Sequence, residues 1–200
     1  MKLIKIDFPE SEYFKEKKNK RQIVLHHTVS DSGKYVDDWW MSDKGKSRVA
    51  AAFVIEKDGT VIQLFEPECW AFHIGKGSSI ADNQQSIAIE IVNEGGLTLN
   101  KKDTKLYWFD GRKMFTGTYL QLLQSWRGYD YFAQYTDEQY RALNELLLKL
   151  CSAFSVPTKL ISTYEYAEKY RNFNGIVSHH NLRKDKSDVS KAFDFAKLKL

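Results

Sequence analysis

Histidines are the residues of this chain whose placement most clearly suggests chemistry. The sequence of 200 residues contains five, and four of them form two adjacent pairs, His26-His27 and His179-His180. Each pair ends a short apolar run (IVL and GIVS), the pattern of a buried strand. Asp188 follows His179 by nine residues in a polar segment. Two imidazoles and this carboxylate could form a Zn²⁺ site with three protein ligands and an open fourth position.

Other residues could supply acid–base chemistry, although each also has an ordinary structural explanation. Glu90 is the one acidic residue of the apolar run QSIAIEIV, where burial would raise its pKa and suit it to accept a proton. It could equally be a carboxylate at the edge of a sheet, facing solvent. Lys186 belongs to the charged run RKDK, which on composition is a solvated loop. Distant histidines need not meet, so the pattern alone leaves the metal site open.

The elements that would position these residues indicate a mixed α/β fold. Runs at 21–28, 85–92 and 175–180 resemble buried strands, and residues 53–64 form a hairpin pattern around Asp58-Gly59. Thr136 and Gln139 form a capping box, which is followed by apolar residues at helical spacing as far as Phe154.

We therefore expect one domain over residues 1–200, with a mixed central β-sheet flanked by helices and a core of about 21–195. A short helix with Val36, Trp39 and Trp40 facing inward is expected after the first strand. Residues 93–133 are rich in glycine and aromatic residues without a clear period, and they are interpreted as an insertion or a loop.

Composition excludes several classes of protein. The net charge is only +4 and no basic cluster or nucleic-acid motif is present, so nucleic acid is not an expected partner. The longest apolar run, residues 49–55, is far too short to span a membrane. The first twenty residues lack the apolar stretch of a secretory signal, so synthesis in the cytoplasm, without stable membrane insertion, is expected. The oligomeric state is open, with a monomer expected.

The order of the motifs resembles one enzyme family. The chain is similar to type 2 N-acetylmuramoyl-L-alanine amidases, the zinc-dependent family related to peptidoglycan recognition proteins and phage amidase-lysozymes. The resemblance covers most of residues 21–195 and rests on six motifs in the family's order, which are IVLHHT, FVIEKDGTVIQL, AFHIG, QSIAIEI, YTDEQYRALNELL and IVSHHNL…KSD.

The resemblance implies a role for each candidate residue. It selects one histidine from each pair, so that Zn²⁺ would be bound by His26, His179 and Asp188, with His27 and His180 as neighbours. Glu90 and Lys186 would be the catalytic residues, and His73 would contact the substrate. Many members carry Tyr or His where this chain has Ala51 and Ala52, which places more of the chemistry on Glu90.

The implied reaction is hydrolysis of the amide bond between N-acetylmuramic acid and L-alanine in bacterial peptidoglycan. The expected setting is a phage endolysin that reaches the cell wall after release. Two alternatives are a non-catalytic module that binds peptidoglycan fragments and a cytoplasmic amidase that recycles such fragments.

Overall fold

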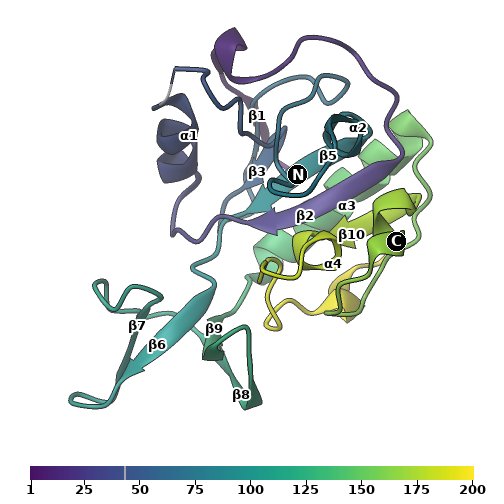
Figure 1. Ribbon diagram of the computed structural model, residues 1–200. Helices are drawn as coiled ribbons and strands as arrows, with labels where there is room; N and C mark the ends of the chain where they lie inside the picture. The colour runs from purple at the N-terminus through teal and green to yellow at the C-terminus, as the bar shows by residue number, and fades with distance from the viewer. Residues whose placement is uncertain (43) are drawn as a thin grey trace.

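A computed structural model describes residues 1–42 and 44–200, with the backbone alone for 35–37. Its central feature is a six-stranded mixed sheet in the order β1-β4-β3-β5-β2-β10 (Figure 1). The expected mixed α/β architecture is confirmed. The strands are β1 (Leu3–Lys5), β2 (Gln22–His27), β3 (Phe53–Ile55), β4 (Val61–Gln63), β5 (Ser86–Ile91) and β10 (Gly175–Ser178).

The three strands that matter most for function are neighbours and run parallel. β2 pairs with β10 on one side and with β5 on the other, and every residue of β2 is buried. Parallel strands covered on both faces are apolar throughout, which is why these runs were recognisable in the sequence. Their carboxyl ends meet at one edge of the sheet.

Helices cover the central sheet and include the one with the clearest sequence signal. Helix α3 (Asp137–Phe154) lies behind the sheet in Figure 1 and begins at the predicted capping box of Thr136 and Gln139. The others are α1 (Gly33–Met41), α2 (Ile80–Gln84) and α4 (His179–Leu182), with single 3₁₀ turns at η1 (Glu10–Glu12), η2 (Glu168–Asn172) and η3 (Phe195–Lys197). None of the helices in the described residues combines the length and apolar character needed to cross a bilayer.

The prediction for α1 was wrong for one residue. Trp40 is buried, whereas the side chain of Trp39 is 65% exposed. Adjacent helical residues point about 100° apart, so both tryptophans cannot face the same core. The side chain of Val36 lies outside the described residues.

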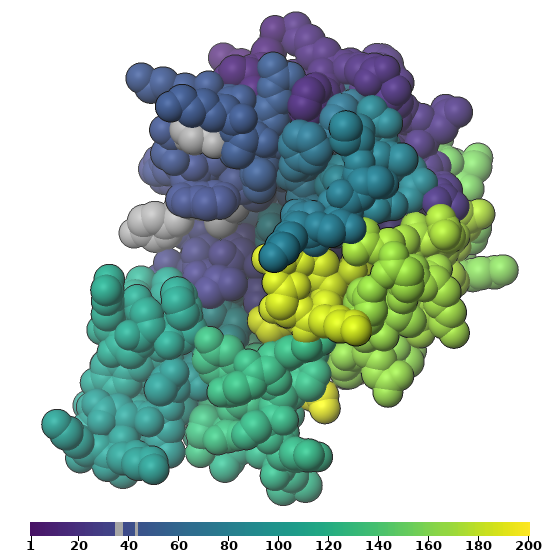
Figure 2. Space-filling model, viewed as in Figure 1, coloured from purple at the N-terminus to yellow at the C-terminus, as the bar shows by residue number. Residues whose placement is uncertain are grey.

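Residues 96–133 form a second sheet, so the expectation of a loop was wrong there. Its four antiparallel strands are ordered β7-β6-β9-β8, with bounds β6 (Gly96–Asn100), β7 (Lys105–Trp108), β8 (Tyr119–Trp126) and β9 (Tyr129–Ala133). We call this the small sheet. It projects from the central sheet at the lower left of Figures 1 and 2. Partly exposed aromatic residues in these strands, among them the adjacent Tyr107 and Trp108, obscured the alternation that identifies a strand.

Candidate metal centre

The carboxyl edge of the central sheet brings together side chains that are far apart in sequence. His26 is near the end of β2, and Glu90 on β5 is its partner in the strand register. His179 directly follows β10, whose last residue pairs with Leu25 of β2. Open sheets with parallel strands generally bind ligands at this edge.

Three buried ligand atoms converge there. Nδ1 of His26 lies 3.0 Å from Nδ1 of His179 and 3.1 Å from Oδ2 of Asp188. Nδ1 of His179 lies 2.9 Å from the same carboxylate oxygen. The three residues therefore form a cluster of the composition that could hold a metal ion.

The second nitrogen of His179 determines where its proton lies. Nε2 is 2.8 Å from the backbone carbonyl of Ile74, which can only accept a hydrogen bond. Nε2 must therefore carry the hydrogen, and in the neutral ring Nδ1 presents a lone pair towards Asp188 and His26.

A longer chain of hydrogen bonds has the same effect on His26. The Ser86 hydroxyl donates to the carbonyl of Asp82 at 2.7 Å, so its oxygen accepts from Nε2 of His73 at 2.8 Å. His73 then accepts, through Nδ1, the hydrogen of His26 Nε2 at 3.1 Å. This order leaves Nδ1 of His26 without a hydrogen as well.

The ionisation states complete a donor set that fits a cation. Burial lowers the pKa of His26 to about 4, so the ring is neutral at pH 7. Burial would raise the pKa of Asp188, but His179 and His26 hold it well below its usual range. Two imidazole nitrogens and a carboxylate oxygen in contact need a positive charge between them, which a proton or a metal ion can supply, and two His and one Asp are ligands that suit Zn²⁺.

Glu90 and Lys186 lie beside this cluster. Oε2 of Glu90 is buried and has no hydrogen-bond partner among the described residues. Burial, and then the charge of Asp188, raise the pKa of Glu90 well above its usual range, while Lys186 opposes them. β5 is an internal strand between β3 and β2. Glu90 therefore does not lie on an outer strand facing solvent, the alternative considered above. Lys186 is half-buried on the loop that leads to Asp188.

The remaining histidines are oriented away from the three ligand atoms. Both ring nitrogens of His73 are engaged, by His26 and Ser86, so the structure places this residue behind a ligand position. Nδ1 of His27 lies 2.8 Å from the Tyr135 hydroxyl. His180 contacts the carbonyl of Thr163 and rests against the ring of Trp126.

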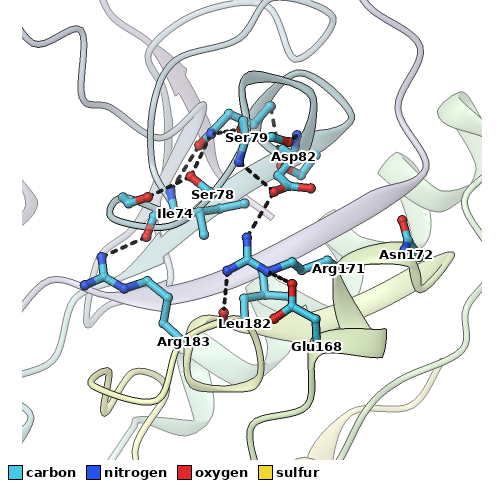
Figure 3. A network of polar contacts seen from close by, with 12 residues as sticks. Ile74, Ser78, Ser79, Asp82, Glu168, Arg171, Asn172, Leu182 and Arg183 are labelled. Atoms are coloured by element: carbon cyan, nitrogen blue, oxygen red, sulfur yellow. Dashed lines mark hydrogen bonds and ion pairs between the residues drawn. The ribbon is translucent and has the colours of Figure 1, made fainter.

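A polar network that the sequence did not reveal holds the segment of His73 and Ile74 (Figure 3). This segment orients His26 through the His73 ring and His179 through the Ile74 carbonyl. Arg183 donates to the Ile74 carbonyl at 3.1 Å, the same oxygen that His179 uses. Arg171 joins Asp82 of α2, at 3.0 Å, to the carbonyl of Leu182 in α4.

The acceptors in these contacts are mostly backbone carbonyls. Every residue has one, so the sequence does not show which of them accept hydrogen bonds. One side chain, Asn83, accepts from the backbone N–H groups of His73 and Ile74 at 3.0 and 3.1 Å. The network therefore fixes the 73–74 segment from α2 on one side and from α4 on the other.

The surface beside the cluster is hollowed. Figure 2 shows a hollow between the α1 segment, the small sheet and the C-terminal segment, with residues that follow β2 at its floor. Two contacts connect its sides. Lys113 of the small sheet pairs with Asp31 at 2.5 Å, and Arg127 donates to the carbonyl of Lys184. Three parts of the chain therefore border this hollow.

Comparisons with known proteins agree with this fold. Residues 16–191 match the model of the Amidase_2 family, described as N-acetylmuramoyl-L-alanine amidase. No curated protein matches. Among solved structures, an AmpD derivative has a TM-score of 0.59 at 17% identity over 98% of this chain and 92% of that one.

Two further solved structures are similar over most of the chain. The amidase LysC from Clostridium intestinale has a TM-score of 0.57 at 16% identity, covering 99% of this chain and 95% of that one. AmiD from E. coli, solved with anhydro-N-acetylmuramic acid-L-Ala-D-γ-Glu-L-Lys, has a TM-score of 0.57 at 17% identity, covering 92% and 58%. At these identities the likeness shows a shared fold.

Proposed function

The chain belongs to the N-acetylmuramoyl-L-alanine amidase family, and from that premise we propose that its amidase reaction on peptidoglycan depends on Zn²⁺ held by His26, His179 and Asp188. The observation that supports this proposal is the meeting of three ligand atoms within 3.1 Å, two of them imidazole nitrogens and one a carboxylate oxygen. A metal ion would bind all three atoms at once, whereas a proton could be shared by only two of them.

The bound ion would supply a Lewis acid that acidifies water and polarises a carbonyl oxygen. Glu90 is proposed as the base. Its carboxylate, whose Oε2 is buried, would accept a proton from the water that attacks the lactyl carbonyl of N-acetylmuramic acid, and would return it to the L-alanine nitrogen as the C–N bond breaks. Lys186 would place its ammonium beside the oxygen that becomes negative.

His73 is proposed to position His26. The earlier expectation was a substrate contact, but both nitrogens of His73 already form hydrogen bonds inside the protein. Outer-shell partners of this kind fix the tautomer of a metal-binding histidine and raise its basicity.

The experiment that tests the proposed function combines metal analysis with an assay on purified sacculi. We expect the isolated protein to contain about one zinc per chain. It should release free amino groups from sacculi, and a chelator should stop this release. Glu90→Gln should abolish the release while retaining the zinc. Full activity after complete removal of the metal, or in Glu90→Gln, would refute the mechanism.

The biological setting is proposed to be that of an endolysin, which acts on polymeric wall. One structural neighbour, with a TM-score of 0.56, is the endolysin amidase LysCS from Clostridium intestinale. The test compares the rate on intact sacculi with the rate on a soluble fragment such as the one bound to AmiD. A chain that cleaves only the soluble fragment would fit a recycling enzyme instead.

A further inference from the structure

The small sheet borders the proposed cleft at one end. Lys113 pairs with Asp31, which follows β2, and Arg127 contacts the loop that carries Lys186. Gly95, which directly precedes the small sheet, approaches the His27 ring so closely that an added Cβ would lie 3.0 Å from Nε2. These contacts place the small sheet directly beside the segments that border the proposed cleft.

The other end of the small sheet projects away from the central sheet (Figure 1). The five residues of β6 extend roughly 17 Å at about 3.4 Å each, and a turn at 101–104 follows. A ligand that contacts both the cleft and this turn must therefore be longer than a single small fragment.

The small sheet has a net positive charge because it contains few acidic residues. Residues 96–133 contain six Lys and Arg against three Asp, a net +3, whereas the whole chain has a net +4. The side chains of Lys101, Lys102 and Lys105 are exposed and form no ion pair within the described residues. Unpaired charge of one sign attracts a ligand of the opposite sign.

Exposed apolar side chains are also concentrated there. Five of the twelve large hydrophobic side chains that are exposed in the described part of the chain belong to this segment, namely Leu99, Phe109, Met114, Tyr119 and Leu123. Scattered exposed apolar residues need no explanation, but a group of them on a small basic sheet indicates a binding surface.

We propose that the small sheet is a docking surface for a polymeric peptidoglycan strand, of which one stem is cleaved in the cleft while neighbouring stems lie on the sheet. This inference rests on the proposed function. A stem such as L-Ala-D-γ-Glu-L-Lys carries two free carboxylates and one amine, so it is net negative. The charge of the small sheet, its length and its position beside the cleft all match such a polymer.

The test measures binding to sacculi that have been stripped of covalently attached phosphate polymers. In a Glu90→Gln background, which prevents turnover, Lys101, Lys102 and Lys105 are all changed to Glu. The matched control changes three exposed lysines far from the small sheet, Lys2, Lys17 and Lys159, to Glu. We expect the first variant to bind stripped sacculi at least about tenfold more weakly and the control to change less than about twofold.

A second measurement separates docking from catalysis. With Glu90 intact, both lysine variants should cleave the soluble muramoyl-tripeptide at the parent rate, because that fragment does not reach the turn. Added salt should weaken binding of the parent to sacculi towards that of the triple variant.

Three results would overturn the proposal. They are unchanged binding to stripped sacculi, a loss seen only on walls that keep their phosphate polymers, and self-association of the parent that the triple change abolishes. If the parent cleaves neither substrate, the proposed function itself fails, and this outcome differs from all three.

Discussion

The two histidines of the candidate centre are held by different kinds of partner. His179 donates to a backbone carbonyl, whereas His26 depends on another side chain, His73, which in turn depends on Ser86. A substitution can therefore remove the hydrogen-bond partner that orients His26, but not the backbone carbonyl that orients His179.

The first prediction concerns His73. Changing His73→Ala removes the acceptor for His26 Nε2, so we expect zinc affinity to fall by about 10–100-fold. Competition with a chelator measures this directly. The control His27→Gln changes a neighbouring ring that pairs with Tyr135, and it should retain the metal. Equal affinity in parent and His73→Ala would contradict the positioning role.

The second prediction concerns pH. Burial raises the pKa of Glu90, and the Lys186 ammonium opposes this shift. A base works only when ionised, so activity falls as the pH drops through its pKa. Lys186→Met should raise that pKa further and move the acidic limb of kcat/KM to higher pH. Lys186→Arg keeps the charge and should leave the limb in place. An unshifted limb in Lys186→Met would show that the two groups are not coupled.

At the scale of elements, local sequence patterns predicted most of the central sheet and the helix α3 that covers it. The capping box and apolar period of α3 were read correctly because a long amphipathic helix repeats its signal over several turns. The strand runs of β2 and β10 predicted that His26 and His179 are delivered at strand ends. Parallel pairing then explains why they meet.

Other parts of the site could not be predicted, for physical reasons. The acceptors on Ile74 and Asp82 are main-chain carbonyls, which every residue possesses. The small sheet has little core of its own, so its strands lack the strict alternation that a half-buried sheet imposes.

The third prediction tests the packing of α3. Leu147 is fully buried and faces the central sheet, so Leu147→Ala should lower the free energy of unfolding by about 2–5 kcal/mol. The adjacent Leu148 is 45% exposed, and Leu148→Ala should change it by less than about 0.5 kcal/mol. Urea denaturation of the two variants measures the difference. Similar losses would mean that the helix is buried on both sides.

At the scale of the molecule, the two ends of the segment that forms the small sheet lie side by side where they join the rest of the chain. The Asn93 side chain donates to the carbonyls of Ala133 and Gln134, both at 3.2 Å, and Gly96 is paired with Phe132. The ends of the segment are therefore held together independently of what lies between them.

The fourth prediction follows from this closure. Replacing residues 97–131 by Asn-Gly should close a hairpin between Gly96 and Phe132. We expect the shortened chain to fold and to cleave the soluble fragment at a rate within about threefold of the parent rate. Its rate on sacculi should be about tenfold lower than that of the parent. Circular dichroism and the two assays check this. A folded but wholly inactive chain would place the small sheet in the catalytic machinery.

The carbonyl of Ile74 has a consequence for how this site can vary during evolution. A main-chain oxygen keeps the proton of His179 in place, so the identity of the side chain at position 74 is irrelevant to that hydrogen bond. Natural variation at this position is constrained only by packing, since the Ile74 side chain is buried beside Val24 and Leu182. Mutational scanning would therefore record position 74 as a packing site, although its backbone sets the tautomer of a proposed metal ligand.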